Sequence, residues 1–76
     1  MARYFLHIRD GNRRIADVEG QEYSIFEEAR KEAVESARDL LAERLRSGKD
    51  VKDYAIELAD ETGNIVARID LQNFSK

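Results

Sequence analysis

Cysteine and proline are both absent from this sequence of 76 residues. Without cysteine the chain forms neither a disulfide bond nor a thiolate metal site, which excludes the class of small disulfide-stapled secreted domains. Without proline, and without any low-complexity stretch, it offers no linker at which it would divide. The sequence therefore predicts a single domain over residues 1–76.

Long apolar runs are absent as well. No stretch approaches the roughly 20 apolar residues that a membrane-spanning helix needs. The apolar part of the opening decapeptide, MARYFLHIRD, is too short for a signal peptide. We expect a cytoplasmic protein with no membrane partner. At 42% hydrophobic and 38% charged residues, the chain still has enough apolar side chains to fold.

Sequence motifs for catalysis and cofactor binding are missing too. There is no glycine-rich phosphate loop, no Gly-x-Ser-x-Gly and no His-Glu-x-x-His. His7 is the only histidine, and Asp10, Asp17 and Glu19 are the carboxylates that a first hairpin would bring near it. A zinc site normally has three or four ligands at defined spacing, which this set lacks. A domain of this size buries only about 60% of its unfolded surface and has no room for a deep cavity. We therefore expect no enzyme, no metal site and no cofactor.

One long helix is the strongest positive signal. Apolar residues recur at steps of three and four, which places them on one buried face of a helix. These residues are Phe26, Ala29, Ala33, Ala37, Leu40, Leu41 and Leu45. Ser24 and Glu27 have the spacing of a capping box, and Gly48 is the residue type that commonly follows a helix. The sequence predicts a helix over about residues 25–47.

Alternating apolar residues on both sides of this helix predict two β-hairpins, over about residues 3–18 and 54–71. In the first hairpin the residues expected to face the helix are Tyr4, Leu6, Ile8 and Ile15. In the second they are Tyr54, Ile56, Leu58, Ile65, Ala67, Ile69 and Leu71. Tyr23 and Val51 should pack just outside the helix, and Phe74 should contact the edge of the core.

The element order is therefore ββαββ. We predict an α+β fold in which the helix packs on one face of a four-stranded, mainly antiparallel sheet. The predicted strand order is 2-1-3-4, because this order joins the two hairpins through the helix without any parallel pairing.

Positive charge is concentrated at the start of the chain. Residues 1–14 carry four arginines and one aspartate, a balance of +3, so the net charge of −3 leaves −6 for the other 62 residues. One helix covers only one face of a sheet, and the other face should be partly apolar, with Phe5, His7, Ala55, Ala59 and Val66. Alternation along the last two strands also places Glu57, Arg68 and Asp70 on that face. The candidate interaction surface consists of Arg3, Phe5, His7, Arg9, Arg13, Arg14 and Val66.

These observations leave three functional hypotheses. The first is a small non-enzymatic binding module, which uses the open sheet face or a strand edge to form a homodimer or to take a protein partner. The second is a nucleic-acid-binding module, in which the basic first hairpin contacts phosphates and Phe5 stacks on a base. The negative net charge opposes this second hypothesis. The third is an enzyme that uses His7, and it has the least support because the sequence supplies neither a nucleophile nor a pocket.

Several short segments together resemble a known family. They are the opening RYFLHIRDG (3–11), DVEG (17–20) and DETG (60–63), arranged around a long helix rich in Ala, Glu and Arg. The set is similar to a family of short, uncharacterised bacterial proteins found mostly in alphaproteobacteria. Members of that family often carry a second aromatic residue where this chain has Leu6. The resemblance implies a small stand-alone bacterial domain and no particular activity or site residue.

Overall fold

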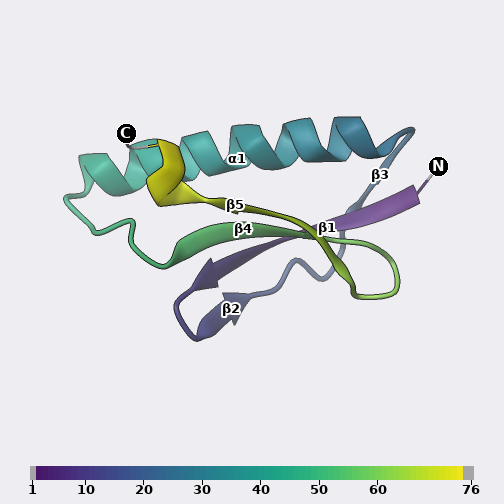
Figure 1. The fold of residues 1–76 in the computed structure, drawn as a ribbon, viewed down its shortest axis with the longest axis horizontal. Helices are drawn as coiled ribbons and strands as arrows, with labels where there is room; N and C mark the ends of the chain where they lie inside the picture. Colours follow the sequence, from purple (N-terminus) through teal and green to yellow (C-terminus); the bar gives the residue numbers. More distant parts are fainter. Residues whose placement is uncertain (1, 75–76) are drawn as a thin grey trace.

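A computed structural model describes residues 2–74, apart from the side chain of Phe74. This part of the chain contains one long helix, α1 (Phe26–Arg46), and a sheet. The strands are β1 (Ala2–Asp10), β2 (Arg13–Ile15), β3 (Gln21–Tyr23), β4 (Tyr54–Ala59) and β5 (Ile65–Asp70), and a 3-10 turn, η1 (Leu71–Phe74), follows them. Figure 1 shows α1 lying along one face of the sheet, with the start of β1 and η1 at opposite ends of the long axis. The predicted α+β fold is confirmed.

Every pairing among the described strands is antiparallel. The order β2-β1-β4-β5 is the predicted 2-1-3-4 order. The prediction was wrong in one respect, because it lacked β3, which pairs with Ala2–Tyr4 at the start of β1 and makes the sheet five-stranded. Three residues are too few to show an alternating pattern, so β3 carries no sequence signal of its own.

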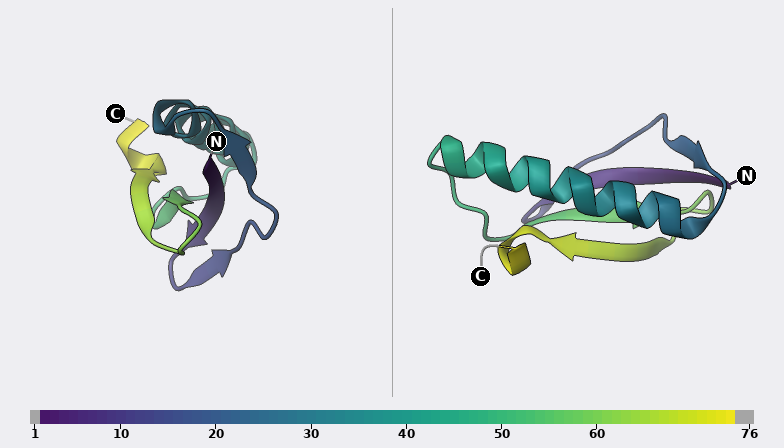
Figure 2. Two further views of the ribbon diagram at one scale, coloured as in Figure 1. Left: turned by 90° about the vertical axis from the view of Figure 1, so that its right-hand side faces the viewer. Right: turned by 90° about the horizontal axis from the view of Figure 1, so that it is seen from above.

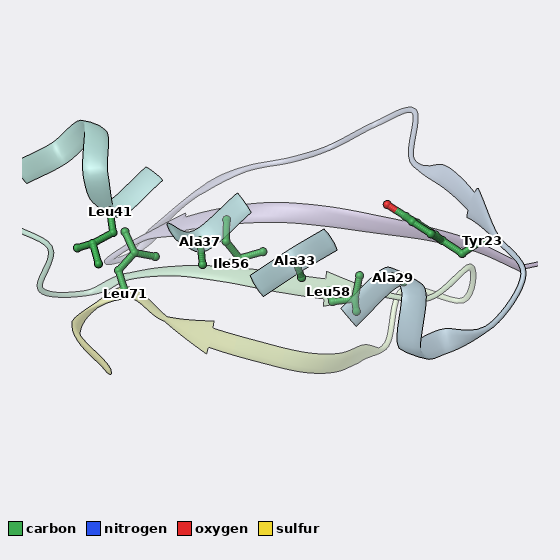
Figure 3. Close-up of a cluster of buried hydrophobic side chains, with 8 residues drawn as sticks. All are labelled: Tyr23, Ala29, Ala33, Ala37, Leu41, Ile56, Leu58 and Leu71. Carbon is green, nitrogen blue, oxygen red and sulfur yellow. The ribbon is translucent and has the colours of Figure 1, made fainter. Parts of the chain in front are cut away.

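The core lies between α1 and the inner face of the sheet, as Figure 3 shows. Its buried residues are Tyr23, Ala29, Ala33, Ala37, Leu41, Ile56, Leu58 and Leu71. The three alanines have no exposed surface. Because their side chains are small, the helix backbone can pack close to β4. Tyr4, Leu6, Ile8, Tyr54 and Val51 pack against this cluster, and the predicted positions of these residues and of Tyr23 are confirmed. The prediction for Phe74 concerns a side chain outside the described part.

The start of α1 differs from the predicted capping box. Ile25 is the N-cap residue and makes no side-chain cap bond. Glu28, rather than Glu27, reaches back, and its carboxylate accepts the Ser24 N–H at 3.1 Å. The helix therefore begins one residue later than the Ser24 spacing indicated, and only half of the reciprocal arrangement forms.

The end of α1 follows the prediction. Gly48 has a φ of 70°, the left-handed conformation that glycine adopts without strain. The Lys49 N–H donates to the Arg44 carbonyl at 2.9 Å, and the Gly48 N–H donates to the Leu45 carbonyl at 3.1 Å. These two bonds form a Schellman motif, which satisfies carbonyl groups that the helix leaves unpaired.

Two residues that were expected in the core are exposed instead. Leu45 is 60% exposed because α1 has 21 residues, about 31 Å, while the six-residue strands below it span about 20 Å. The last turn of the helix therefore extends past the sheet (Figure 1). Ile15 is 53% exposed because β2 lies at the sheet edge, where α1 makes no contact with it. β2 is also shorter than the predicted strand, which extended to Val18.

Ile65 was also wrongly assigned to the inner face. The pairing of β4 with β5 shifts by one residue between Leu58 and Ala59, so that Ala59 pairs with Ile65 and Leu58 with Ala67. This bulge places Ile65 on the outer face beside Val66, and both are exposed. Ala67 and Ile69 stay on the inner face and pack on the core as predicted.

Candidate functional site: the outer face of the sheet

The outer face of the sheet is the face that α1 leaves uncovered. Figure 2 shows the helix on one side of the curved sheet and β2 at the far end from it. Alternation along β4 turns Ala55, Glu57 and Ala59 to this face, as predicted. Both alanines are nevertheless fully buried, because larger residues stand opposite them: Arg9 pairs with Ala55, and Phe5 pairs with Ala59. The expectation that these alanines give the face an apolar surface was therefore wrong.

Glu57 occupies the centre of the outer face, and three arginines surround it. Its side chain is only 7% exposed, although a glutamate is rarely buried without a partner. Arg68 Nη1 lies 3.0 Å from Oε2, Arg9 Nη2 lies 3.4 Å from Oε1, and Arg14 Nε lies 3.8 Å from the same Oε1. We call these four residues the arginine cluster. They come from four different strands, β1, β2, β4 and β5.

The charges in the arginine cluster do not balance. Arg68 has a second carboxylate partner, because its Nε lies 3.1 Å from Asp70 Oδ1. Arg9 and Arg14 share one oxygen of Glu57 at long distances, and they stand directly opposite each other in the β1–β2 pairing. Like charges in such a position repel. The side chains of the three arginines are 30–44% exposed, so the unbalanced positive charge faces solvent.

His7 lies next to the arginine cluster, directly opposite Glu57 in the β1–β4 pairing. Its ring is parallel to that of Phe5, with an interplanar angle of 9° and 6.3 Å between centroids. Its Nδ1 accepts the Asp17 backbone N–H at 3.0 Å. An acceptor nitrogen carries no proton, so neutral His7 holds its proton on Nε2. His7 therefore contacts a backbone amide, and the Asp17 carboxylate has other partners.

The segment of residues 16–20, which we call the Asp17 loop, covers a gap in the sheet edge. β1 pairs with β3 at Ala2–Tyr4 and with β2 at Ile8–Asp10, so Phe5–His7 has no strand beside it on that edge. Asp17 supplies the hydrogen-bond acceptor that a neighbouring strand would otherwise provide, because its Oδ2 accepts the Leu6 N–H at 3.2 Å. Its Oδ1 accepts the N–H groups of Glu19 and Gly20 at 3.3 and 3.1 Å. The loop is thereby fixed against the site.

Gly20 ends the Asp17 loop and allows it to approach Phe5. Its φ is 67°, and a Cβ on it would lie 2.7 Å from the Phe5 ring and 2.8 Å from the Tyr4 carbonyl oxygen. We expect Gly20→Ala to lower the free energy of unfolding by roughly 2–4 kcal/mol, combining left-handed strain with a steric clash. Gly11→Ala is the matched control, since Gly11 also has a positive φ but open space around it. Urea unfolding that gives equal losses for the two variants would contradict the close approach.

The titration behaviour of His7 follows from this environment. Burial lowers the pKa of His7, and the positive charge of Arg14 acts in the same direction, while Asp17 and Glu57 oppose them. For Asp17, burial alone would raise the pKa, but the backbone N–H groups of Gly20, Leu6 and Glu19 hold it below its usual value. At neutral pH His7 is therefore neutral and Asp17 is ionised.

A dependence of stability on pH follows from the lowered pKa of His7. The unfolded chain binds a proton at His7 more readily than the folded chain. The free energy of unfolding should therefore decrease as the pH falls through about 6.5, until the folded form also binds the proton. Urea unfolding between about pH 7.5 and pH 5.5 should show a smaller decrease for His7→Gln, which cannot titrate. Identical pH profiles for the two proteins would contradict this assignment.

The other predicted surface residues are dispersed. Arg3 lies near the start of β1, away from the arginine cluster. Its Nη1 donates to the Glu19 carbonyl at 2.7 Å, and its Nη2 lies 3.7 Å from Glu22 Oε2. Arg13 pairs with Asp10 in the sheet, one position from the Arg9–Arg14 pair, so alternation turns it to the opposite face. Val66 is exposed beside the bulge. Of the predicted set, the fold thus gathers Phe5, His7, Arg9 and Arg14.

Glu57 and Arg68 were not in the predicted surface. Asp17 was expected near His7 and lies there, but its carboxylate accepts backbone N–H groups and the ring accepts its backbone N–H. Glu57 and Arg68 were assigned to the outer face, but the sequence does not show that they lie beside the first hairpin. That proximity depends on the pairing of β1 with β4, whose paired residues are about 50 positions apart in the chain. A charged residue at the centre of an apolar strand was the one available signal, since such a residue needs a partner.

A hollow lies between β3 and α1, away from the arginine cluster. It is an acidic groove of about 400 Å³, lined by Gln21, Glu22, Tyr23, Glu28, Lys31, Glu32 and Glu35. The Tyr23 hydroxyl is buried and has no hydrogen-bond partner among the described residues. Burial raises the pKa of Tyr23, and the charges of Glu32 and Asp17 add to this effect. The groove is thus negative, in contrast to the arginine cluster.

Two kinds of feature are absent from residues 2–74. No group of three or more His, Cys, Asp or Glu side chains is placed to hold a metal ion there. No helix in the same range is long and apolar enough to cross a membrane.

Comparison with known proteins gives one match. A family model described as "Domain of unknown function (DUF6894)" matches residues 3–72. No curated protein and no solved structure matches the chain. The matched range contains α1, most of β1, all the other strands and every residue of the arginine cluster.

Proposed function

Since the chain belongs to this domain family of unknown function, we propose from its geometry that it is a small non-enzymatic binding module. The outer face of the sheet docks an acidic segment of a partner protein. The observation that carries this proposal is the arginine cluster, in which three guanidinium groups converge on one buried carboxylate.

The electrostatics of the face support an acidic partner. The chain as a whole carries −3, so a positive region is a local departure from its average. Exposed charges act over about 8–10 Å at physiological salt, which is sufficient to steer an acidic segment onto the cluster. Arginine is also the side chain best suited to bind carboxylates through paired N–H groups. Phe5 lies beside the cluster and adds an aromatic contact.

The same charges argue against a face-to-face homodimer. A two-fold axis through the arginine cluster would place the cluster of one chain against the same cluster of its partner. Like charges brought together at an interface cost several kcal/mol by general estimates, about the free energy that such a contact would supply. A homodimer through the outer face is therefore the less favoured form of the binding hypothesis.

Single-stranded nucleic acid is a second candidate partner, favoured by one observation. The parallel rings of Phe5 and His7 lie beside Arg9 on the same strand face, and such rings stack with bases. The cations do not form a long track, however, because Arg3 is already engaged by Glu19 and Glu22, and Arg13 faces the other side of the sheet. This arrangement suits a local contact better than a nucleic-acid strand.

Binding is tested by fluorescence anisotropy at low salt, with a labelled oligo-glutamate peptide, single-stranded RNA and single-stranded DNA as probes. We expect the peptide to bind in a salt-dependent way and Arg14→Gln to weaken it. Arg30→Gln, on the exposed surface of α1, is the matched control because it removes the same charge elsewhere. Light scattering run in parallel reports the oligomeric state. Equal binding by the two variants, or tighter binding of the oligonucleotides, would refute the proposal.

A further inference from the structure

Arg9 and Arg14 place two like charges side by side on the outer face. The two residues are directly paired across β1 and β2, and both contact the same Oε1 of Glu57. Their distances from that oxygen, 3.4 and 3.8 Å, are longer than those of strong charge-assisted hydrogen bonds. One carboxylate oxygen therefore holds two cations together without fully neutralising either.

The three arginines have more N–H donors than the neighbouring carboxylate oxygens can accept. Each guanidinium has five N–H donors, and Glu57 has two oxygens, one of which Arg68 approaches at 3.0 Å. Asp70 accepts from Arg68 and not from the other two arginines. Arg9 and Arg14 thus retain several donors that face the partly exposed surface. A ligand with several acceptor oxygens and more than one negative charge would match them.

We propose that Arg9 and Arg14 form a subsite for a phosphate monoester on the docked segment, with binding linked to protonation of His7. This inference rests on the proposed function, since it names the group that the partner presents. A phosphate monoester carries up to two charges and three acceptor oxygens, whereas a carboxylate offers one charge and two oxygens. Paired arginines bind such a group through parallel N–H bonds. The compact cluster fits one such dianion better than the singly charged repeat of a nucleic-acid backbone.

The linkage to His7 follows from the groups that surround its ring. They are Arg9 on its own strand, Arg14 on β2, Asp17 on the loop, Glu57 on β4 and Phe5 stacked against it. The charge of Arg14 makes protonation of His7 less favourable. A dianion bound to Arg14 would cancel that effect and favour the imidazolium. The bound phosphate should therefore raise the pKa of His7, and protonation of His7 should strengthen binding in return.

Protonation of His7 should also change the backbone environment of the Asp17 loop. Protonated His7 has a hydrogen on Nδ1 and no longer accepts the Asp17 N–H. The amide signal of Asp17 should therefore shift together with the imidazole signals of His7. Gln at position 7 keeps an acceptor oxygen for this N–H but does not titrate. His7→Gln thus separates the role of the hydrogen bond from the role of the charge.

The test is an NMR titration of the whole chain with inorganic phosphate, against sodium chloride at matched ionic strength. Phosphate should raise the pKa of His7 by about half a pH unit or more, and chloride should not. Arg14→Gln should abolish the shift, and Arg30→Gln should retain it. An acidic peptide with one phosphoserine should bind at least about tenfold more tightly than a peptide of equal net charge carrying extra glutamates. The affinity of the parent chain relative to that of His7→Gln should rise as the pH falls, because the phosphate titrates in both cases and only the parent chain gains the imidazolium.

The outcomes separate this inference from the proposed function. A pKa of His7 that responds equally to phosphate and chloride, or equal affinity for the two peptides, overturns the phosphate subsite. If both peptides still bind and both depend on Arg14, the proposed function stands without it. If neither peptide binds, both proposals are refuted. Tighter binding of an oligonucleotide than of the phosphopeptide also overturns the inference, because it would assign the subsite to a phosphodiester.

Discussion

Replacing Leu58 with alanine should lower the free energy of unfolding by about 2–5 kcal/mol, the usual cost of truncating a buried leucine. Leu58 has no exposed surface and lies on β4, the strand nearest the middle of the core. It is one of the two largest fully buried side chains, the other being Leu71. A domain of this length has a total stability of about 4–11 kcal/mol, so the loss is a large fraction of it. Urea unfolding followed by circular dichroism measures the change.

Leu45→Ala is the matched control for Leu58→Ala. It removes the same atoms from a leucine that is 60% exposed on the overhanging turn of α1. We expect a change within about 0.5 kcal/mol, as for other surface substitutions. Similar losses for the two variants would show that Leu45 packs on the core and that the helix does not extend past the sheet.

Glu57→Gln should have two opposite effects. The substitution keeps the size of the side chain but removes the one carboxylate that Arg9 and Arg14 contact among residues 2–74. The remaining cations then repel one another, and we expect the free energy of unfolding to fall by about 1–3 kcal/mol. This is less than for a fully buried ion pair because the arginines are partly exposed. The affinity for an acidic peptide should rise, since the positive charge of the face increases by one.

Stability and peptide affinity of Glu57→Gln are both needed to interpret this variant. Glu61→Gln is the control, because Glu61 is exposed in the loop between β4 and β5 and the substitution changes the net charge equally. A variant at Glu57 that kept its stability would indicate that the arginines do not depend on the carboxylate. A variant that lost affinity would indicate that the Glu57 carboxylate is needed to position the arginines for binding.

The helix and the strands β1, β4 and β5 could be predicted because each has a repeating apolar pattern. Ala29, Ala33 and Ala37 mark the buried stripe of α1, and all three are fully buried. The errors arose where the pattern depends on distant parts of the chain. Leu45 continues the stripe, but the sheet beneath it has ended. Ile15 continues the alternation, but β2 lies beyond the reach of the helix.

Local irregularities caused the remaining errors. The bulge after Leu58 turns Ile65 outward, and a one-residue shift of this kind leaves no mark in the alternation of β5. The start of α1 was misplaced by one residue because both Glu27 and Glu28 can reach back to the preceding turn. The spacing of apolar residues thus predicted the elements of the fold. The face on which a single residue such as Ile65 lies depended on the strand register, which that spacing does not show.

The site was less predictable than the fold. The sequence indicated a basic first hairpin and an outward-facing Glu57, but it did not indicate that they meet. Their meeting depends on the pairing of His7 with Glu57 between two hairpins that α1 separates. Arg13 illustrates the same limit, because it adjoins Arg14 in the sequence and faces the opposite side of the sheet. The charge balance of the first hairpin therefore suggested more arginines on the outer face than the fold places there.

We propose that Arg9 and Arg14 serve binding more than stability. The double variant Arg9→Gln/Arg14→Gln tests it most directly, with unfolding and phosphopeptide affinity measured on the same sample. Arg68 remains to pair with Glu57 at 3.0 Å, so the free energy of unfolding should stay within about 1 kcal/mol of the parent chain. The affinity should fall by about 100-fold, the loss of two charge-assisted contacts. An unchanged affinity, or a loss of folding in place of a loss of binding, would contradict the claim.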